Sequence, residues 1–143
     1  ALDGWMAWKA QVPPPERRGQ VLVDPPFEEP GDFNRMAEGL AGAHRRWPGG
    51  TTLMWYPVKD GNGSEACAEA LSTSGIARIL QVELRVDRAG AGGPLAGTGL
   101  FIINPPFTLE AELQALVPFL ARRLARGPDA NSRIVWIAEE QQT

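Results

Sequence analysis

The chain has few residues of the kinds that build metal sites and disulfides. Its 143 residues include a single cysteine, Cys67, and a single histidine, His44. One cysteine excludes an internal disulfide framework and any cysteine-rich metal site, so we expect no bound metal. His44 shares one face of a predicted helix with Met36, Leu40 and Trp47, and we interpret it as a packing residue rather than a ligand or base.

The chain also lacks a basic excess and a long apolar run. It has 14 lysines and arginines against 17 acidic residues, a net charge of -3. A nucleic acid would therefore have to bind local patches, and the candidates are Arg17-Arg18, Arg45-Arg46 and the group Arg122, Arg123 and Arg126. Arginines near helix ends can equally be partners of the helix dipole. No run approaches the ~20 apolar residues of a membrane span and no signal-peptide pattern opens the chain, so we expect a soluble protein of the cytoplasm.

Hydrophobic periodicity predicts alternating strands and helices. Strands are expected at 20–24, 51–56, 76–86, 99–104 and 134–137, and helices at 32–47, about 65–74 and 109–124. Because no helix separates the strands at 76–86 and 99–104, we expect them to be antiparallel. The glycines at 90–93 precede a strand rather than a helix, which argues against a phosphate loop. The predicted fold class is α/β, with helices on both faces of a mostly parallel sheet that has an antiparallel element at one edge.

The most informative motif is Val-Leu-Val-Asp-Pro-Pro-Phe at residues 21–27. A buried parallel strand that ends in these residues delivers a turn to the carboxyl edge of the sheet, where open α/β sheets bind ligands. Asp24 can accept a hydrogen bond from the exocyclic amine of a flat base. Pro25 and Pro26 lack N–H donors and turn backbone carbonyls toward the same point, while Phe27 offers a stacking face. The segment therefore predicts a site that holds an amine for attack, although Asp-Pro-Pro can also be a simple turn.

A second copy of the motif, Asn104-Pro105-Pro106-Phe107, has the same chemical capacity. The strand before it is predicted to lie at the edge of the sheet and to point the opposite way. That direction places Asn104 away from the ligand crevice. We therefore assign the site to Asp24 and not to Asn104.

Five segments agree in order with one known family. They are Asp3-Gly4-Trp5, residues 18–27, Trp55-Tyr56-Pro57-Val58, residues 79–84 and residues 99–110. With these segments the chain resembles, over nearly all of its length, the C-terminal half of bacterial 23S ribosomal RNA adenine-N6 methyltransferases of the RlmJ family. On this resemblance, residues 1–143 are the C-terminal portion of a single Rossmann-like class I methyltransferase domain whose N-terminal part is missing.

The resemblance implies S-adenosylmethionine as the methyl donor and ribosomal RNA as the partner. The aspartate that matches Asp24 faces the target amine in that family, and the residues that match Asp3-Gly4 lie near the adenine end of the donor. Two departures stand out. The family usually has tyrosine where this chain has Phe27, and its glycine-rich donor loop has no counterpart here.

The expected function is methyl transfer to N6 of an adenine in large-subunit ribosomal RNA. Asp24, Pro25, Pro26 and Phe27 would form the catalytic turn, and Asp3, Gly4 and Asp24 would face the donor. Tyr56 and Lys59, at the end of the neighbouring strand, would border the substrate together with Phe27, or else be a packing residue and a solvated charge. The alternative is a truncated or degenerate methyltransferase-fold domain that binds RNA or protein without catalysis. Neither a membrane nor a metal is expected as a partner, and a monomer is the simplest expectation.

Overall fold

The computed structural model describes residues 4–29, 31–59, 63–88, 90 and 95–139. Along the chain the elements are α1 (Gly4–Gln11), β1 (Gln20–Val23), α2 (Asp32–Arg46), β2 (Thr51–Val58), α3 (Ser64–Ser72), β3 (Ile79–Arg85), β4 (Gly97–Ile103), α4 (Leu109–Leu124) and β5 (Asn131–Ala138). The strands form one mixed sheet in the order β1-β2-β4-β3-β5. The α/β class is confirmed.

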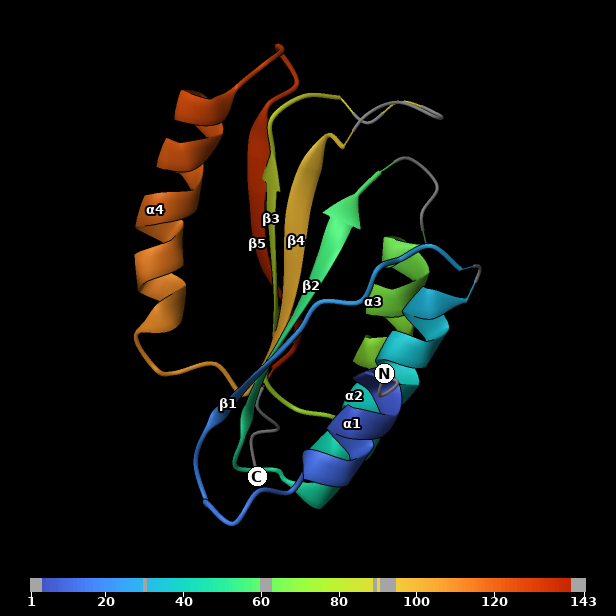
Figure 1. Ribbon diagram of the computed structural model, residues 1–143. Coiled ribbons are helices and arrows are strands. Elements are labelled where there is room, and N and C mark those ends of the chain that lie inside the picture. Colours follow the sequence, from blue (N-terminus) through green and yellow to red (C-terminus); the bar gives the residue numbers. More distant parts are fainter. Residues whose placement is uncertain (1–3, 30, 60–62, 89, 91–94, 140–143) are drawn as a thin grey trace.

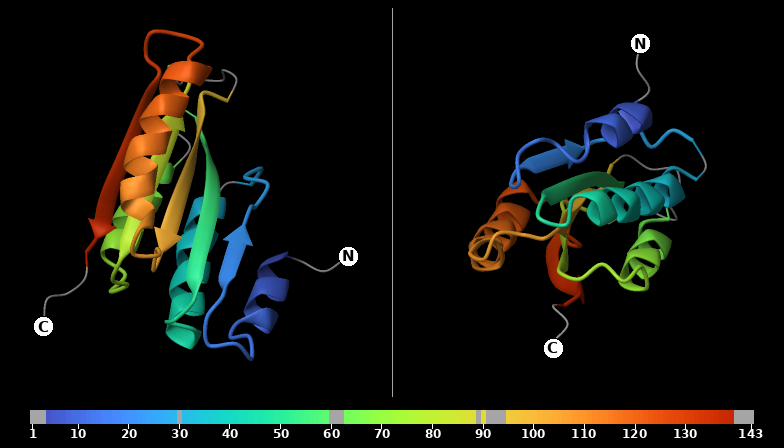
Figure 2. Two further views of the ribbon diagram at one scale, coloured as in Figure 1. Left: turned by 90° about the vertical axis from the view of Figure 1, so that its left-hand side faces the viewer. Right: turned by 90° about the horizontal axis from the view of Figure 1, so that it is seen from below.

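Helices cover both faces of the sheet (Figure 1). The first three helices lie on one face, where the largest apolar cluster includes Met36, Leu40 and Met54. On the other face α4 packs against β3 and β5, around Leu80 and Val117. Figure 2 shows β1 at one edge of the sheet, beside α1 and away from α4. The alternation of side chains along each strand supplies both apolar layers.

The expectation of a mostly parallel sheet is wrong. Among the described strands, β1–β2 is the parallel pair, whereas β4 is antiparallel to both β2 and β3, and β5 is antiparallel to β3. β4 follows β3 directly in the order of elements, and the Val86 amide donates to the Ala96 carbonyl at 2.8 Å, so β4 returns antiparallel to β3. The reversed direction of β4 is confirmed, but its expected edge position is wrong because β4 is the central strand.

The elements differ from the sequence expectation at several points. The strand expected at 76–86 begins only at Ile79, because Arg78 has a φ of 59°. β2 continues through Pro57, because β1 ends at the Val23–Met54 pair and leaves β4 as the neighbour there. Helix α1 was not predicted, although its Trp5 and Trp8 have helical spacing.

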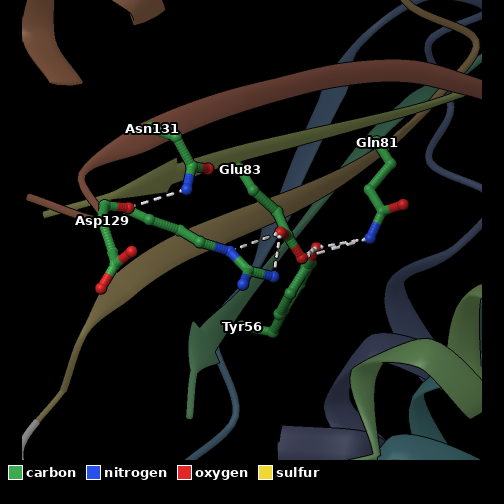
Figure 3. A network of polar contacts seen from close by, with 6 residues as sticks. Tyr56, Gln81, Glu83, Asp129 and Asn131 are labelled. Carbon is green, nitrogen blue, oxygen red and sulfur yellow. Dashed lines mark hydrogen bonds and ion pairs between the residues drawn. The ribbon is translucent and has the colours of Figure 1, made fainter. Parts of the chain in front are cut away.

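A buried polar bridge crosses the centre of the sheet (Figure 3). The Tyr56 hydroxyl donates to Glu83 Oε1 and accepts from Gln81 Nε2, both at 2.8 Å. Arg85 Nη2 donates to the second oxygen of Glu83, also at 2.8 Å. Between Tyr56 and Glu83 lies Gly99 of β4, where a Cβ would fall 2.1 Å from the tyrosine ring. The bridge therefore depends on the absence of a side chain at Gly99.

Candidate active site

A groove of about 780 Å³ runs along the free edge of β1, between that strand and α1. Its lining is mainly apolar and includes Trp5, Trp8 and Val12 from the helix side and Val21 from the strand. Asp24, Pro25 and Pro26 also line the groove. The size lies within the range of small-molecule sites, and the polar Asp24 side chain can fix the orientation of a ligand.

The turn after β1 has free acceptors. Asp24 and Pro26 are exposed, while Pro25 is buried. Within the described residues, no donor contacts the Asp24 carboxylate, and the carbonyls of Pro25 and Pro26 accept no hydrogen bond. A carboxylate and a carbonyl that lie close together in one turn can accept from the two N–H bonds of a single amine.

Phe27 closes the turn in a left-handed conformation, with a φ of 51°. Its half-buried ring lies 4.8 Å from the ring of Phe33 and 6.1 Å from that of Trp55, measured between centroids. A non-glycine residue in this conformation costs about 1–2 kcal/mol, and the two ring contacts offset that cost. Trp55 was not singled out from the sequence, since an aromatic residue inside a strand is an ordinary core residue.

The second Pro-Pro turn lies about four residues of β2 away from the level of the Asp24 turn in the strand register. Ile103 pairs with Thr52, so Asn104 lies where β2 begins rather than where it ends. The backbone carbonyl of Asn104 accepts from Thr51 Oγ1 at 2.9 Å, and the backbone N–H of Asn104 donates to the Arg78 carbonyl at 2.9 Å. Arg78 Nη2 in turn donates to the Pro105 carbonyl at 2.9 Å. The backbone carbonyls of this turn are therefore occupied, whereas no hydrogen bond reaches the Asn104 side chain among the described residues.

The structure places the other predicted site residues in different surroundings. Gly4 lines the groove near Asp24, whereas Asp3 lies outside the described residues. Tyr56 is fully buried with its hydroxyl in the polar bridge, so the expectation that it borders the substrate is wrong. Burial also raises the pKa of the Tyr56 phenol. Lys59 is exposed just beyond β2, four residues past the level of Asp24 in the β1–β2 register and therefore ~13 Å along the strand.

The remaining ionisable side chains do not form a second centre. No group of three or more His, Cys, Asp or Glu side chains in the described ranges is placed to hold a metal ion. Burial raises the pKa of the Cys67 thiol to about 12, which leaves it protonated and unreactive near neutral pH, and burial lowers the pKa of His44. None of the described helices is both long enough and apolar enough to cross a membrane.

Comparisons with known proteins agree with one another. A family model described as "Ribosomal RNA large subunit methyltransferase D, RlmJ" matches residues 1–138. Proteins named ribosomal RNA large subunit methyltransferase J are 33% identical in Haemophilus influenzae and 34% identical in Escherichia coli K12, over 96% of this chain and 49% of each relative. The crystal structure of protein LPL1258 from Legionella pneumophila superposes with a TM-score of 0.79 and 25% identity, over 94% of this chain and 48% of that one. The chain thus spans about half the length of the relatives it matches.

Proposed function

Because the chain belongs to the RlmJ family of large-subunit ribosomal RNA methyltransferases, we propose that it supplies the acceptor side of a methyl transfer to N6 of an adenine in that RNA. The donor would be S-adenosylmethionine, and the reaction would take place in the cytoplasm. The proposal rests on the Asp24–Pro25–Pro26 turn, which lines the groove and has unpaired hydrogen-bond acceptors. The chain would be the C-terminal portion of one Rossmann-like methyltransferase domain, in which β1, β2 and β3 run in the same direction.

The task of the turn is to hold and orient the amine. An adenine stacked in RNA hides N6, so the base must first swing out, at a cost of a few kcal/mol. The N6 lone pair is delocalised into the ring, which makes the nitrogen a poor nucleophile. If the Asp24 carboxylate and the Pro25 carbonyl accept its two N–H bonds, the nitrogen becomes more pyramidal and its lone pair points out of the ring plane. Positioning of this kind supplies much of the rate.

No strong base is needed before the transfer. The amine becomes acidic only when it is methylated, and Asp24 or water can then take the proton. The exposed Asp24 carboxylate has no cation within 4 Å in the described part of the chain, so it is available to accept that proton. Phe27 would stack on the flipped base, a contact that is typically worth ~1–3 kcal/mol. Its ring packs against Phe33 and Trp55, which restrains the plane of the ring.

Residues beside the groove are compatible with part of a donor site. S-adenosylmethionine, when bound, would supply an electrophilic methyl group. A Cβ built at Gly4 meets no atom within 4 Å, so the space at the start of α1 is open, and Asp3, Gly4 and Asp24 would face the donor there. The glycine-rich loop of the family's donor site would belong to the half of the relatives that this chain does not match. The chain therefore offers one wall of a donor site.

The incomplete donor site also favours a second candidate function. A methyltransferase-fold domain without a complete donor site would bind RNA or protein without catalysis. The free acceptors of the Asp24 turn favour the enzyme, because a binding domain has no need to keep them unpaired.

A chimaeric protein tests the proposal. This chain would replace the matching half of the Escherichia coli relative, and the purified chimaera would be incubated with S-adenosylmethionine and large-subunit RNA that lacks the modification. Digestion and mass spectrometry should find N6-methyladenosine, and the Asp24→Ala chimaera should produce far less of it. A methyl group on another atom, or undiminished product from Asp24→Ala, would contradict the proposal.

A further inference from the structure

Two of the three arginine groups that the sequence offers for nucleic acid lie where β2 begins. Gly19 follows Arg17-Arg18, and its carbonyl accepts from the Thr51 amide at 3.0 Å, which places this pair beside the start of β2. Helix α2 ends with Arg45-Arg46, shortly before the same strand begins. Open α/β sheets bind ligands at the carboxyl ends of their parallel strands. Both pairs therefore lie away from the ligand edge of the sheet.

The third arginine group lies at the other end of these strands, where β2 and β3 end. Arg122 and Arg123 belong to the last turn of α4, and Arg126 follows that helix. The Arg126 N–H donates to the Val86 carbonyl, directly after β3, and Arg126 Nη2 donates to the Leu95 carbonyl, both at 2.7 Å. Figure 1 shows α4 ending at the same side of the molecule as the arrowhead of β2. This group therefore lies at the carboxyl edge of the sheet.

Arg122 and Arg123 are exposed and have free hydrogen-bond donors. In the described ranges no carboxylate lies within 4 Å of either guanidinium group. A role toward the dipole of α4 uses only their charge and leaves the N–H groups available, and a guanidinium group can bind a phosphate through two of them. The acidic side chains Asp87 and Asp129 lie at the same edge. Binding of an anion there would thus depend on individual arginines and not on a uniform positive field.

Two further cations lie between the Asp24 turn and the end of α4. Lys59 follows β2, Arg88 follows β3, and both side chains are exposed. In the order of the sheet, Asp24 follows the edge strand β1, and the two cations follow the next two strands that run in the same direction. The end of α4 comes next, since that helix packs on β3 and β5. The exposed cations of this edge form one basic row, which consists of Lys59, Arg88, Arg122 and Arg123.

The basic row has a length that suits a short segment of RNA. Through the strand registers, the level of Asp24 corresponds to Val82 on β3, and Val86 lies four residues farther along. Four residues along β3 and three strand spacings across the sheet place Val86, and the Arg126 N–H bonded to it, ~20 Å from Asp24. A nucleic-acid strand presents several phosphates over such a distance.

We infer, on the basis of the proposed function, that the basic row binds the RNA phosphates that flank the adenine held by Asp24. The chain has a net charge of -3, so it has no general attraction for RNA and needs a local row of cations. Phosphate contacts fix the register and orientation of a nucleic acid without reading its bases. The four side chains are therefore positioning residues, which bring the target adenine to the turn and take no part in the methyl transfer.

RNA affinity at several salt concentrations tests the inference. The chimaera described above is titrated with large-subunit RNA that lacks the modification, in a filter-binding assay without S-adenosylmethionine. Arg122→Gln combined with Arg123→Gln should weaken binding by about 10-fold or more at ~0.1 M salt. It should also lower the slope of log affinity against log salt concentration by about 1–2, because each lost phosphate contact releases roughly one counterion fewer. Arg122→Lys combined with Arg123→Lys keeps both charges and should bind within about 3-fold of the parent.

A matched double variant at the other end of the strands controls for net charge. Arg17→Gln combined with Arg45→Gln removes the same charge from two exposed arginines and should bind RNA within about 3-fold of the parent. Urea denaturation of both glutamine variants measures any loss of stability. A role toward the helix dipole alone predicts lower stability for the variant at Arg122 and Arg123 with unchanged RNA affinity, which would overturn the inference.

Other outcomes would contradict the basic row as well. An equal loss of affinity in the control variant would mean that the attraction is diffuse, and a loss with an unchanged salt slope would mean that no phosphate contact was removed. At saturating RNA, single-turnover methylation by the variant at Arg122 and Arg123 should stay within about 3-fold of the parent, since positioning residues act on binding. A much slower rate at saturation would contradict that role. Salt-dependent binding through the row without any N6-methyladenosine would refute the proposed function alone, so the two failures are distinguishable.

Discussion

The two Pro-Pro turns share a sequence pattern and differ in which end of the pattern is held. In the Asp24 turn the aromatic end is fixed, because Phe27 packs on Phe33 and Trp55, while the carboxylate is exposed. In the Asn104 turn the backbone of Asn104 is fixed by hydrogen bonds to Thr51 and Arg78, while Phe107 is 96% exposed. The pattern alone does not define a site, since the chemistry depends on which groups the fold leaves unpaired.

The sharpest test of this difference removes the polar residue from each turn. In the chimaera, Asp24→Ala should lower single-turnover methylation on the order of 1000-fold, because the acceptor of the target amine is lost. Asn104→Ala should leave methylation nearly unchanged and cost about 1 kcal/mol of unfolding free energy, because alanine tolerates its φ of 52° less well than asparagine. An inactive, folded Asn104→Ala beside an active Asp24→Ala would reverse the assignment.

Neither Pro-Pro turn should bind S-adenosylmethionine without additional polypeptide. We expect the 143-residue chain alone to show no saturable heat in a titration with S-adenosylmethionine, because it offers one wall of the donor site. The chimaera serves as the positive control. A micromolar dissociation constant for the chain alone would place the donor site within these residues.

Exchanging the aromatic residues tests the other end of each turn. Phe27→Leu removes the stacking face and should slow methylation in the chimaera by roughly 5-fold to 100-fold, whereas Phe27→Tyr should be close to neutral. Phe107→Leu, on an exposed ring, should change neither rate nor stability measurably. Equal rates for the leucine and tyrosine variants at Phe27 would make that ring a packing residue behind the turn.

Releasing the fixed acceptors of the second turn should affect stability alone. Arg78→Ala removes the hydrogen bond to the Pro105 carbonyl and should lower the unfolding free energy by about 1–2 kcal/mol in urea denaturation. Arg78→Lys keeps the charge as a control but loses the planar donor group. If Arg78→Ala abolished methylation in a folded chimaera, the second turn would take part in the reaction after all.

The smallest expected effect concerns the pH dependence of the stability of the folded chain. Burial lowers the pKa of His44 in the folded chain, so the unfolded chain binds the proton more readily. Its contribution to stability is therefore present above the unfolded pKa of ~6.5 and is lost as the pH falls through the lower, folded value. Urea denaturation from pH 7 to pH 5 should show less loss of stability for His44→Gln than for the parent chain. An identical pH dependence would show that His44 does not contribute.

Sequence reasoning identified the features that depend on local pattern. The strand before Asp24, the apolar stripe of α2 and the reversal of β4 follow from periodicity and from the short β3–β4 connection. The position of β4 in the sheet did not follow, because periodicity does not say where a returning strand inserts. The Asp24 turn was selected from the sequence, and the structure places Asp24, Pro25 and Pro26 in the lining of the groove. That Tyr56 points into the core and not toward the substrate depends on which face of β2 is buried, and both faces of that strand are apolar.

The bridge from Tyr56 over Gly99 to Glu83 has a consequence for how the molecule opens. It joins β2, β4 and β3 through one buried carboxylate, so these strands should unfold together as a single cooperative unit. Helix α1 and strand β1 lie outside that unit. The Asp24 turn therefore lies between two parts of the molecule. Strands β2, β4 and β3 open only when the whole protein unfolds, whereas α1 and β1 can open locally. An engineer could therefore change α1, β1 and the Asp24 turn without rebuilding β2, β4 and β3.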